Sequence, residues 1–250
     1  MRITVLGCGT SGGVPVIGNY WGACDPNNPK NRRSRVSVAV EEGATRLIID
    51  TSPDLRQQCL DNNIDKVDGV LFTHDHADHT HGIDDLRIMA MRSRQRVPIY
   101  ADKGTLETLN RRFDYIFASK EGYPAICEGN LIDGAFELGG MQIQPFQQHH
   151  GFMDTLGFRI GDFAYSTDVV ELDDAAFEAL AGIKVWIVTA LRYDPHPTHA
   201  HLAKTLEWIE RVKPERAYLT HMTWEMDYDT LMKELPDGVE PAYDGLVIDI

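Results

Sequence analysis

The sequence predicts an α/β fold in which two mixed β-sheets pack face to face, with helices on their outer faces. Two observations support this. Short apolar strands alternate with helical segments in both halves of the chain, and a middle section alternates apolar and polar residues as antiparallel hairpins do. The chain of 250 residues is long enough for one large domain or two small ones. Because no linker is visible, we expect residues 1–250 to form a single domain.

The first half begins with strands expected at residues 2–7, 36–40 and 46–50, each a short apolar run. Pro53 then precedes a helix at 54–63, because proline is tolerated at the start of a helix. Further strands are expected at 69–73 and 97–101, with a helix between them at 79–92. The strand at 69–73 ends where a histidine-rich segment begins.

In the second half, residues 136–165 form the hairpin section, with turns at Gly139-Gly140 and Gly161-Asp162. An amphipathic helix is expected at 199–212, between strands expected at 184–189 and 216–220. A final helix at 227–235 and a closing strand complete the pattern. Strands and helices thus interleave in this half as they do in the first.

The composition is that of a soluble enzyme, with 43% hydrophobic and 25% charged residues. No apolar run approaches the roughly 20 residues that span a bilayer, and the first residues lack the features of a signal peptide. We therefore expect a cytoplasmic protein without membrane contact. In that compartment the scattered cysteines are expected as free thiols, namely Cys8, Cys24, Cys59 and Cys127.

The net charge of −14 repels a long polyanion, so no long nucleic acid is expected as a partner. One small basic cluster lies at residues 31–35, Asn-Arg-Arg-Ser-Arg. It is expected as a solvated turn, and the alternative is a contact to a small phosphorylated ligand. The cluster is too small for a duplex footprint.

The strongest chemical signal is the segment 73–79, Thr-His-Asp-His-Ala-Asp-His. Alternate residues of an extended segment point the same way, so His74 and His76 can share one metal ion. Asp78 and His79 follow the turn and can reach a second ion. Imidazole and carboxylate ligands suit zinc, manganese or iron, and leave positions open for water.

This segment resembles the signature motif of the metallo-β-lactamase superfamily, whose other motifs occur in the expected order. The resemblance implies the αββα sandwich and two divalent metal ions, Zn²⁺ or Mn²⁺. It assigns His74, His76 and His150 to one ion, Asp78, His79 and His221 to the other, Asp168 as the bridge, and Asp50 as a supporting carboxylate behind the ligands. His149 is the alternative to His150, which we prefer because Gly151 follows it.

Differences from other branches of the superfamily reduce the number of candidate activities. β-Lactamases have a cysteine where this chain has Asp168, and flavo-di-iron oxidoreductases have a glutamate where it has Ala77. Thioesterases of the glyoxalase II type append a helical substrate domain after the fifth motif. The chain beyond His221 accommodates only a helix and a strand, so a thioesterase is a weaker alternative.

Three segments, at residues 7–15, 82–87 and 196–199, resemble the phosphodiesterase family of the carbon–phosphorus lyase pathway. That family opens five-membered cyclic phosphates on ribose, and the resemblance makes His199 the active-site histidine and proton donor. The alternative role for His199 is capping or packing at a helix N-terminus. The family also holds a structural metal with three cysteines and a histidine. Here only Cys24 remains and Trp224 replaces the histidine, so we expect no such site and aromatic packing by Trp21 and Trp224 in its place.

The sequence therefore predicts a binuclear phosphodiesterase that hydrolyses small cyclic ribose or nucleotide phosphodiesters with a metal-bound hydroxide. Its expected partners are a small phosphodiester or nucleotide substrate and a nucleoside monophosphate as a product-like ligand. A homodimer is left open. The alternatives are a tRNA 3′-end endonuclease, which normally carries a long basic arm, and a non-catalytic metal-binding scaffold.

Overall fold

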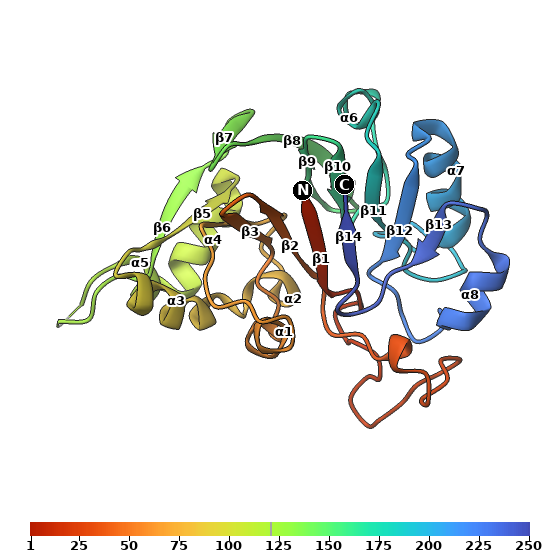
Figure 1. The fold of residues 1–250 in the computed structure, drawn as a ribbon, viewed down its shortest axis with the longest axis horizontal. Coiled ribbons are helices and arrows are strands. Elements are labelled where there is room, and N and C mark those ends of the chain that lie inside the picture. The colour runs from red at the N-terminus through yellow and green to blue at the C-terminus, as the bar shows by residue number, and fades with distance from the viewer. Residues whose placement is uncertain (121) are drawn as a thin grey trace.

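The computed structural model describes residues 1–120 and 122–250, which form two mixed β-sheets with helices on their outer sides (Figure 1). The strand order is β14-β1-β2-β3-β4-β5-β6 in one sheet and β13-β12-β11-β10-β9-β8-β7 in the other. In each sheet some neighbouring strands are antiparallel and others parallel. The predicted α/β sandwich of two mixed sheets is confirmed.

The first sheet contains β1 (Arg2–Gly7), β2 (Ser37–Glu42), β3 (Thr45–Ile49), β4 (Gly69–Leu71), β5 (Val97–Ala101), β6 (Cys127–Leu131) and β14 (Val247–Asp249). The second contains β7 (Phe136–Leu138), β8 (Met141–His150), β9 (Met153–Ile160), β10 (Phe163–Ser166), β11 (Val185–Thr189), β12 (Arg216–Thr220) and β13 (Val239–Pro241). The helices are α1 (Leu55–Asp61), α2 (Ala77–Thr80), α3 (Leu86–Ser93), α4 (Lys103–Arg112), α5 (Asp114–Phe117), α6 (Asp174–Leu180), α7 (Leu202–Val212) and α8 (Tyr228–Glu234). Two 3₁₀ turns lie at Pro29–Asn31 and Ile83–Asp85.

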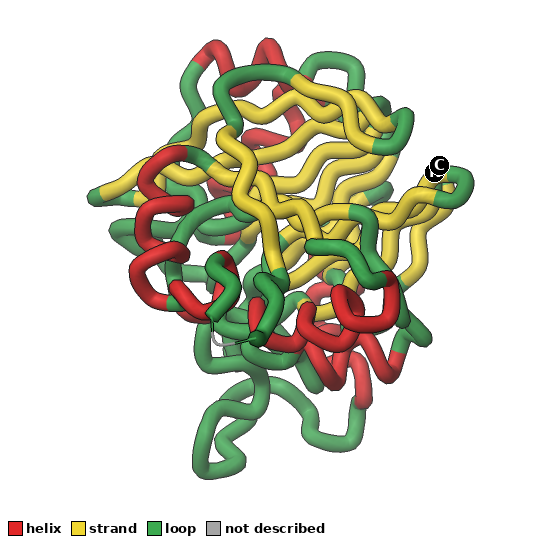
Figure 2. The backbone as a smooth tube through the Cα atoms, turned by 90° about the vertical axis from the view of Figure 1, so that its left-hand side faces the viewer, coloured by secondary structure: helices red, strands yellow, loops and turns green. Residues whose placement is uncertain are grey.

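The core has two parts, because the first sheet is buried on both faces. In β2, Val38 and Val40 pack in the cluster between the sheets, whereas Ala39 packs in the outer cluster with α1 and α3. β3 divides its side chains in the same way, with Leu47 facing inward and Ile48 outward. This period of two explains why residues 38–40 and 47–49 are apolar in succession, since both faces of the sheet are covered there. Figure 2 shows the stacked strands with helices on both sides.

The predicted helix at 79–92 is wrong, because the chain breaks it into α2, a 3₁₀ turn and α3. The break lies at Gly82, whose backbone N–H donates to the carbonyl oxygen of Thr51 at 2.9 Å. A Cβ atom at this position would lie 2.0 Å from the carbonyl oxygen of Ser52. The segment therefore passes too close to the loop after β3 for a side chain or a continuous helix.

The predicted helix at 199–212 begins later, at Leu202, so His199 lies in a loop. Ala200 explains the late start: its N–H donates to Val169 and its carbonyl accepts from Leu191, at 2.7 and 3.0 Å. These bonds hold the backbone before α7 in the sheet region. Four elements, α4, α5, β6 and α6, were not predicted, and two strands, β13 and β14, follow α8 where one closing strand was expected.

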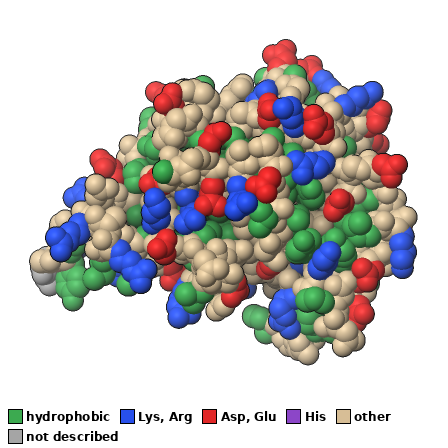
Figure 3. Space-filling model, in the orientation of Figure 1, with side chains coloured by type: hydrophobic (Ala, Val, Ile, Leu, Met, Phe, Trp, Pro, Cys, Tyr) green, Lys and Arg blue, Asp and Glu red, His purple; other side chains and the backbone are tan. Residues whose placement is uncertain are grey.

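No helix in the described parts of the chain is long and apolar enough to cross a membrane. All four cysteines are free thiols, as expected, and all four are buried. The face in Figure 3 carries basic and acidic side chains intermixed, without a continuous basic stripe.

Candidate metal centre

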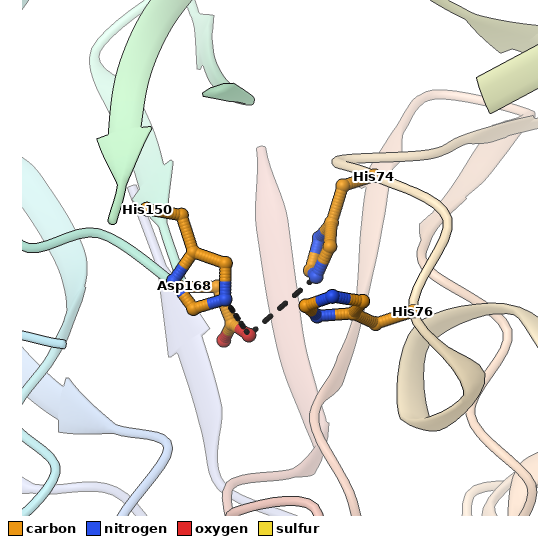
Figure 4. A group of neighbouring side chains, drawn as sticks. All are labelled: His74, His76, His150 and Asp168. Atoms are coloured by element: carbon orange, nitrogen blue, oxygen red, sulfur yellow. Dashed lines mark ion pairs between the residues drawn. The ribbon is translucent and has the colours of Figure 1, made fainter. Parts of the chain in front are cut away.

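The predicted ligands come together at one end of the sandwich, where strands of both sheets end. His74 and His76 lie in the loop after β4, whereas Asp78 and His79 lie on the short helix α2. The remaining three lie at the ends of second-sheet strands: His150 closes β8, Asp168 follows β10, and His221 follows β12. Figure 4 shows His150 and Asp168 facing His74 and His76.

The side chains form two groups, each with potential ligand atoms within 4.8 Å of one another. One group contains His74, His76, His150 and Asp168, and the other contains Asp78, His79, Asp168 and His221. This is the same division that the resemblance implied, with Asp168 common to both groups. That these residues bind metal remains a prediction.

Asp168 occupies the centre of the arrangement. Its Oδ2 atom lies 3.5 Å from His74 Nε2, 3.6 Å from His150 Nε2 and 3.3 Å from His79 Nε2. Its other oxygen, Oδ1, lies 3.1 Å from His221 Nε2. One carboxylate thus faces histidines of both groups.

Three residues of the site have left-handed backbones, which are uncommon for side chains other than glycine. Their φ angles are 63° at Asp50, 50° at Asp168 and 57° at His221. Each directly follows a strand or lies two residues beyond it, so the backbone turns sharply where the strand ends. Such strained residues concentrate at functional sites, where the surrounding fold holds them in place.

Asp50 supports the ligand loop from behind. Its carboxylate accepts hydrogen bonds from the N–H and the hydroxyl of Thr73, both at 2.8 Å. It also lies 2.7 Å from His79 Nδ1, so Nε2 of that ring faces the centre. A carboxylate behind a metal-binding imidazole fixes its tautomer and orientation.

The structure separates the neighbouring histidines at the end of β8. His150 is buried and belongs to the first ligand group, and its Nδ1 donates to the carbonyl oxygen of Thr198 at 2.7 Å. His149 is exposed on the opposite face of the strand, where it contacts Asp154 at 2.7 Å. Alternation along the strand produces this difference.

Several ring nitrogens in the centre have no hydrogen-bond partner among the described residues. They are Nε2 of His74, Nε2 of His79 and both nitrogens of His221. An unpaired buried polar atom is costly, and a metal ion supplies the missing interaction. The residues present therefore fit divalent cations.

The pKa shifts of these residues also indicate a site that suits divalent cations. Burial lowers the pKa of His74 well below its usual range. Burial also acts to lower the pKa of His79, but the carboxylates of Asp168, Asp78 and Asp50 raise it well above its usual range. Burial acts to raise the pKa of Asp168, yet His221 and His79 hold it well below its ordinary value. The cluster favours positive charge at its centre.

Comparison with known proteins decides the family. The sequence matches the beta-lactamase superfamily domain over residues 45–222, which is more than half of the chain. The chain belongs to the metallo-β-lactamase superfamily.

Three similar proteins illustrate the range of named relatives of this metallo-β-lactamase-fold chain. A crystal structure described as a new diphosphatase from the PhnP family is 36% identical, with a TM-score of 0.91, and covers 100% of this chain and 97% of that one. An octanoyltransferase of Porphyromonas gingivalis is 32% identical over 98% of this chain. A ribonuclease Z of Bradyrhizobium diazoefficiens is 27% identical over 52% of it. The chain spans about half the length of these two curated relatives, 51% and 45%.

His199 also lies at the centre of this metallo-β-lactamase site. Its Nε2 is 3.5 Å from Asp168 Oδ2, a distance similar to those of the predicted ligand histidines His74, His79 and His150. Its Nδ1 lies 2.8 Å from the Thr198 hydroxyl and 3.2 Å from His196 Nδ1. Burial lowers the pKa of His199. Because α7 begins at Leu202 with His201 as its N-cap, His199 does not cap this helix, and its catalytic role remains a prediction.

The basic cluster at residues 31–35 was expected as a solvated turn. This prediction is wrong for Arg33, whose exposed fraction is only 1%. Backbone hydrogen bonds pair Arg33 with Val14 in both directions, each at 2.8 Å, and draw the side chain inside. The guanidinium donates to the carbonyl oxygens of Thr223 and Met226, at 3.2 and 2.6 Å. It also lies 3.8 Å from Cys24 Sγ, where related proteins are expected to hold their structural metal.

Trp21 and Trp224, which were expected to pack in place of the structural metal, contact different partners. Trp21 lies under the guanidinium of Arg32, whereas Trp224 contacts the ring of Tyr20 edge-on at 6.0 Å. Arg35 forms an ion pair with Asp54 at 3.0 Å. The contact between Tyr20 and Trp224 thus joins the first loop to the segment after β12, and the ion pair joins the same loop to the start of α1.

The sequence prediction missed residues that complete the pocket over the ligands. Ser11, Phe152, Met153 and Thr198 line it together with the predicted histidines and aspartates. Two of them fall in segments already noted, the glycine-rich 7–15 and the 196–199 motif. No signal identified Phe152 and Met153, apart from their place directly after His150-Gly151.

Proposed function

We propose that this hydrolase is a metal-dependent phosphodiesterase acting on small phosphodiesters, in particular cyclic ribose or nucleotide phosphates. The observation that carries the proposal is the pair of ligand groups that share Asp168. The full-length similarity to a PhnP-family diphosphatase supports chemistry at phosphorus. The partial similarity to ribonuclease Z supports the same chemistry.

The two groups would each hold one divalent ion, Zn²⁺ or Mn²⁺, with Asp168 binding both. When bound, such a pair supplies a nucleophilic water at neutral pH and positive charge beside the non-bridging phosphate oxygens. His74, His76 and His150 would hold the first ion, and Asp78, His79 and His221 the second.

The protein's own side chains do the remaining work. Asp168 fixes the separation of the two groups, and Asp50 keeps the His79 ring oriented. His199 faces the same centre and would donate a proton to the ribose oxygen as it leaves. Because burial lowers the pKa of His199, a bound phosphate has to raise it for His199 to be protonated. Its 3.5 Å approach to Asp168 is also compatible with a ligand role, so metal content must be measured alongside activity.

A diphosphatase activity is the second candidate. The solved relative described by that name is 36% identical and covers this chain completely. A phosphoanhydride and a phosphodiester present similar non-bridging oxygens to two cations, so the same site accommodates either. The octanoyltransferase name belongs to a protein about twice this length, so no transferase activity is proposed from it.

A substrate panel tests the proposal. Protein loaded with zinc or manganese is assayed on 2′,3′-cyclic AMP, bis(p-nitrophenyl) phosphate, ADP-ribose, a pre-tRNA and a thioester. Asp168→Asn serves as the inactive control, and Asp154→Asn, an exposed aspartate beside His149, as the matched active control. We expect the cyclic nucleotide to be hydrolysed fastest. Preference for ADP-ribose would favour the diphosphatase, whereas preference for pre-tRNA or the thioester would refute the proposal.

A further inference from the structure

One large aromatic side chain stands at the mouth of the metal-centre pocket without a partner. Phe152 is 97% exposed, yet it lines the pocket that His150, Asp168 and His199 also line. Exposed apolar side chains are ordinary when they are scattered. This one borders the site, and Met153 beside it lines the same pocket.

The turn that carries Phe152 is fixed relative to the ligands. Gly151 has a φ of 72°, and a Cβ atom there would lie 2.5 Å from the Thr198 side chain. The ring of His150 donates to the carbonyl oxygen of the same threonine at 2.7 Å. The β8–β9 turn is thus packed and hydrogen-bonded against the loop that contains Thr198 and His199. Phe152 therefore projects from a backbone that two independent contacts hold beside the centre.

The chemistry of the pocket indicates what Phe152 contacts. No lysine or arginine is among its described lining residues, so this wall offers no cation for a second anionic group. Phe152 and Met153 instead offer an apolar surface beside the ligand groups. An exposed aromatic ring is a surface on which nucleobases stack, because every base has a flat face.

We propose that Phe152, backed by Met153, forms a subsite that stacks on the nucleobase of the ligand, so that the preferred substrates are nucleotides rather than sugar phosphates without a base. The proposal rests on the proposed function for the location of the phosphate. The subsite would recognise a second part of the ligand, the aromatic base that lies beside this phosphate.

Binding of two product-like compounds tests the subsite without requiring turnover. AMP and ribose 5-phosphate share the phosphate and the ribose and differ in the base. Calorimetry on zinc-loaded protein would compare the wild type with Phe152→Ala, Phe152→Tyr and Met91→Ala. Met91 is an exposed apolar residue of α3 that does not line the pocket, so its variant is the matched control.

We expect the wild type and Met91→Ala to bind AMP about 5- to 100-fold more tightly than ribose 5-phosphate, the range that base stacking typically provides. Phe152→Ala should remove this preference while leaving ribose 5-phosphate binding unchanged, and Phe152→Tyr should retain it. Equal binding of the two compounds by the wild type, no binding of either, or an unchanged preference in Phe152→Ala would overturn the subsite. AMP preference through Phe152 without hydrolysis of any phosphodiester would instead refute the proposed function alone.

Discussion

Two buried polar clusters in this protein balance their charge in different ways. The metal centre gathers carboxylates and histidines around Asp168, and several of its ring nitrogens lack partners among the described residues. The second cluster surrounds Arg33, whose terminal nitrogens donate to the carbonyls of Thr223 and Met226. We infer that the first cluster takes up a cation from solution, whereas the second contains its own in the Arg33 guanidinium.

This difference separates a functional site from a structural one. A buried guanidinium whose terminal nitrogens donate to carbonyl oxygens holds two loops together without an ion from solution. A buried set of carboxylates and imidazoles whose ring nitrogens lack partners is the arrangement that binding of a metal ion would complete. Where related proteins are expected to hold a structural metal beside Cys24, this chain has the Arg33 side chain. We infer that the guanidinium provides the cross-link that a metal would otherwise provide.

The largest expected effect comes from the adjacent histidines at the end of β8. His150→Ala removes a ligand and should lower phosphodiesterase activity about a thousandfold or more, since metal ions contribute several kcal/mol to such reactions. His149→Ala changes an exposed residue on the other face of the strand and should leave activity and metal content close to wild type. Elemental analysis and steady-state kinetics measure both. A reversed pattern would transfer the ligand role to His149.

His199 should matter according to how strongly the leaving oxygen needs a proton. A ribose alkoxide needs one, whereas nitrophenolate leaves as the anion. His199→Ala should therefore slow 2′,3′-cyclic nucleotide hydrolysis about 10²–10⁴-fold more than bis(p-nitrophenyl) phosphate hydrolysis, with metal retained. Equal slowing of both substrates would assign His199 to phosphate positioning. Loss of metal would make it a ligand.

Replacing Arg33 should lower the stability of the protein without changing its metal content. Arg33→Met leaves the carbonyls of Thr223 and Met226 unpaired, and should lower the free energy of unfolding by about 3 kcal/mol. Arg32→Met, its exposed neighbour over Trp21, should change it by less than about 1 kcal/mol. Denaturant unfolding of the metal-loaded protein compares the two variants. If the two variants are equally stable, the hydrogen bonds of Arg33 do not stabilise the fold, and the proposed structural role of this cluster is wrong.

The smallest effect is expected at Asp50, which orients a ligand without binding an ion. Asp50→Asn should weaken metal affinity about 10- to 100-fold, as is typical when a carboxylate behind a ligand histidine is replaced. Competition with a chelator measures the affinity. An unchanged affinity would mean that the packing around His79 orients its ring without the carboxylate of Asp50.

The sequence predicted most strands and all members of the two ligand groups, because their signals are local or ordered along the chain. β1, β5 and β12 have the predicted bounds, since each is a short apolar run between turns. The 73–79 segment contains four ligand-type residues next to one another. His150 required a preference over His149, and strand alternation supplies the physical reason for it.

Other features depend on contacts between distant segments and could not be predicted. The break at Gly82 arises from its approach to Ser52, and the burial of Arg33 arises from pairing with Val14. The left-handed backbone at Asp168 and His221 depends on how each strand ends against the rest of the site. Phe152 carries no local signal either, because its importance lies in the pocket that it borders.

The central claim is that the two ligand groups each bind one divalent ion. Native mass spectrometry of protein purified without chelator, then titrated with zinc or manganese, tests it most directly. We predict two ions per chain in the wild type and in Arg33→Met, and fewer in Asp168→Asn, because Asp168 belongs to both groups. A wild type that binds no ion or only one at saturating metal would contradict the account.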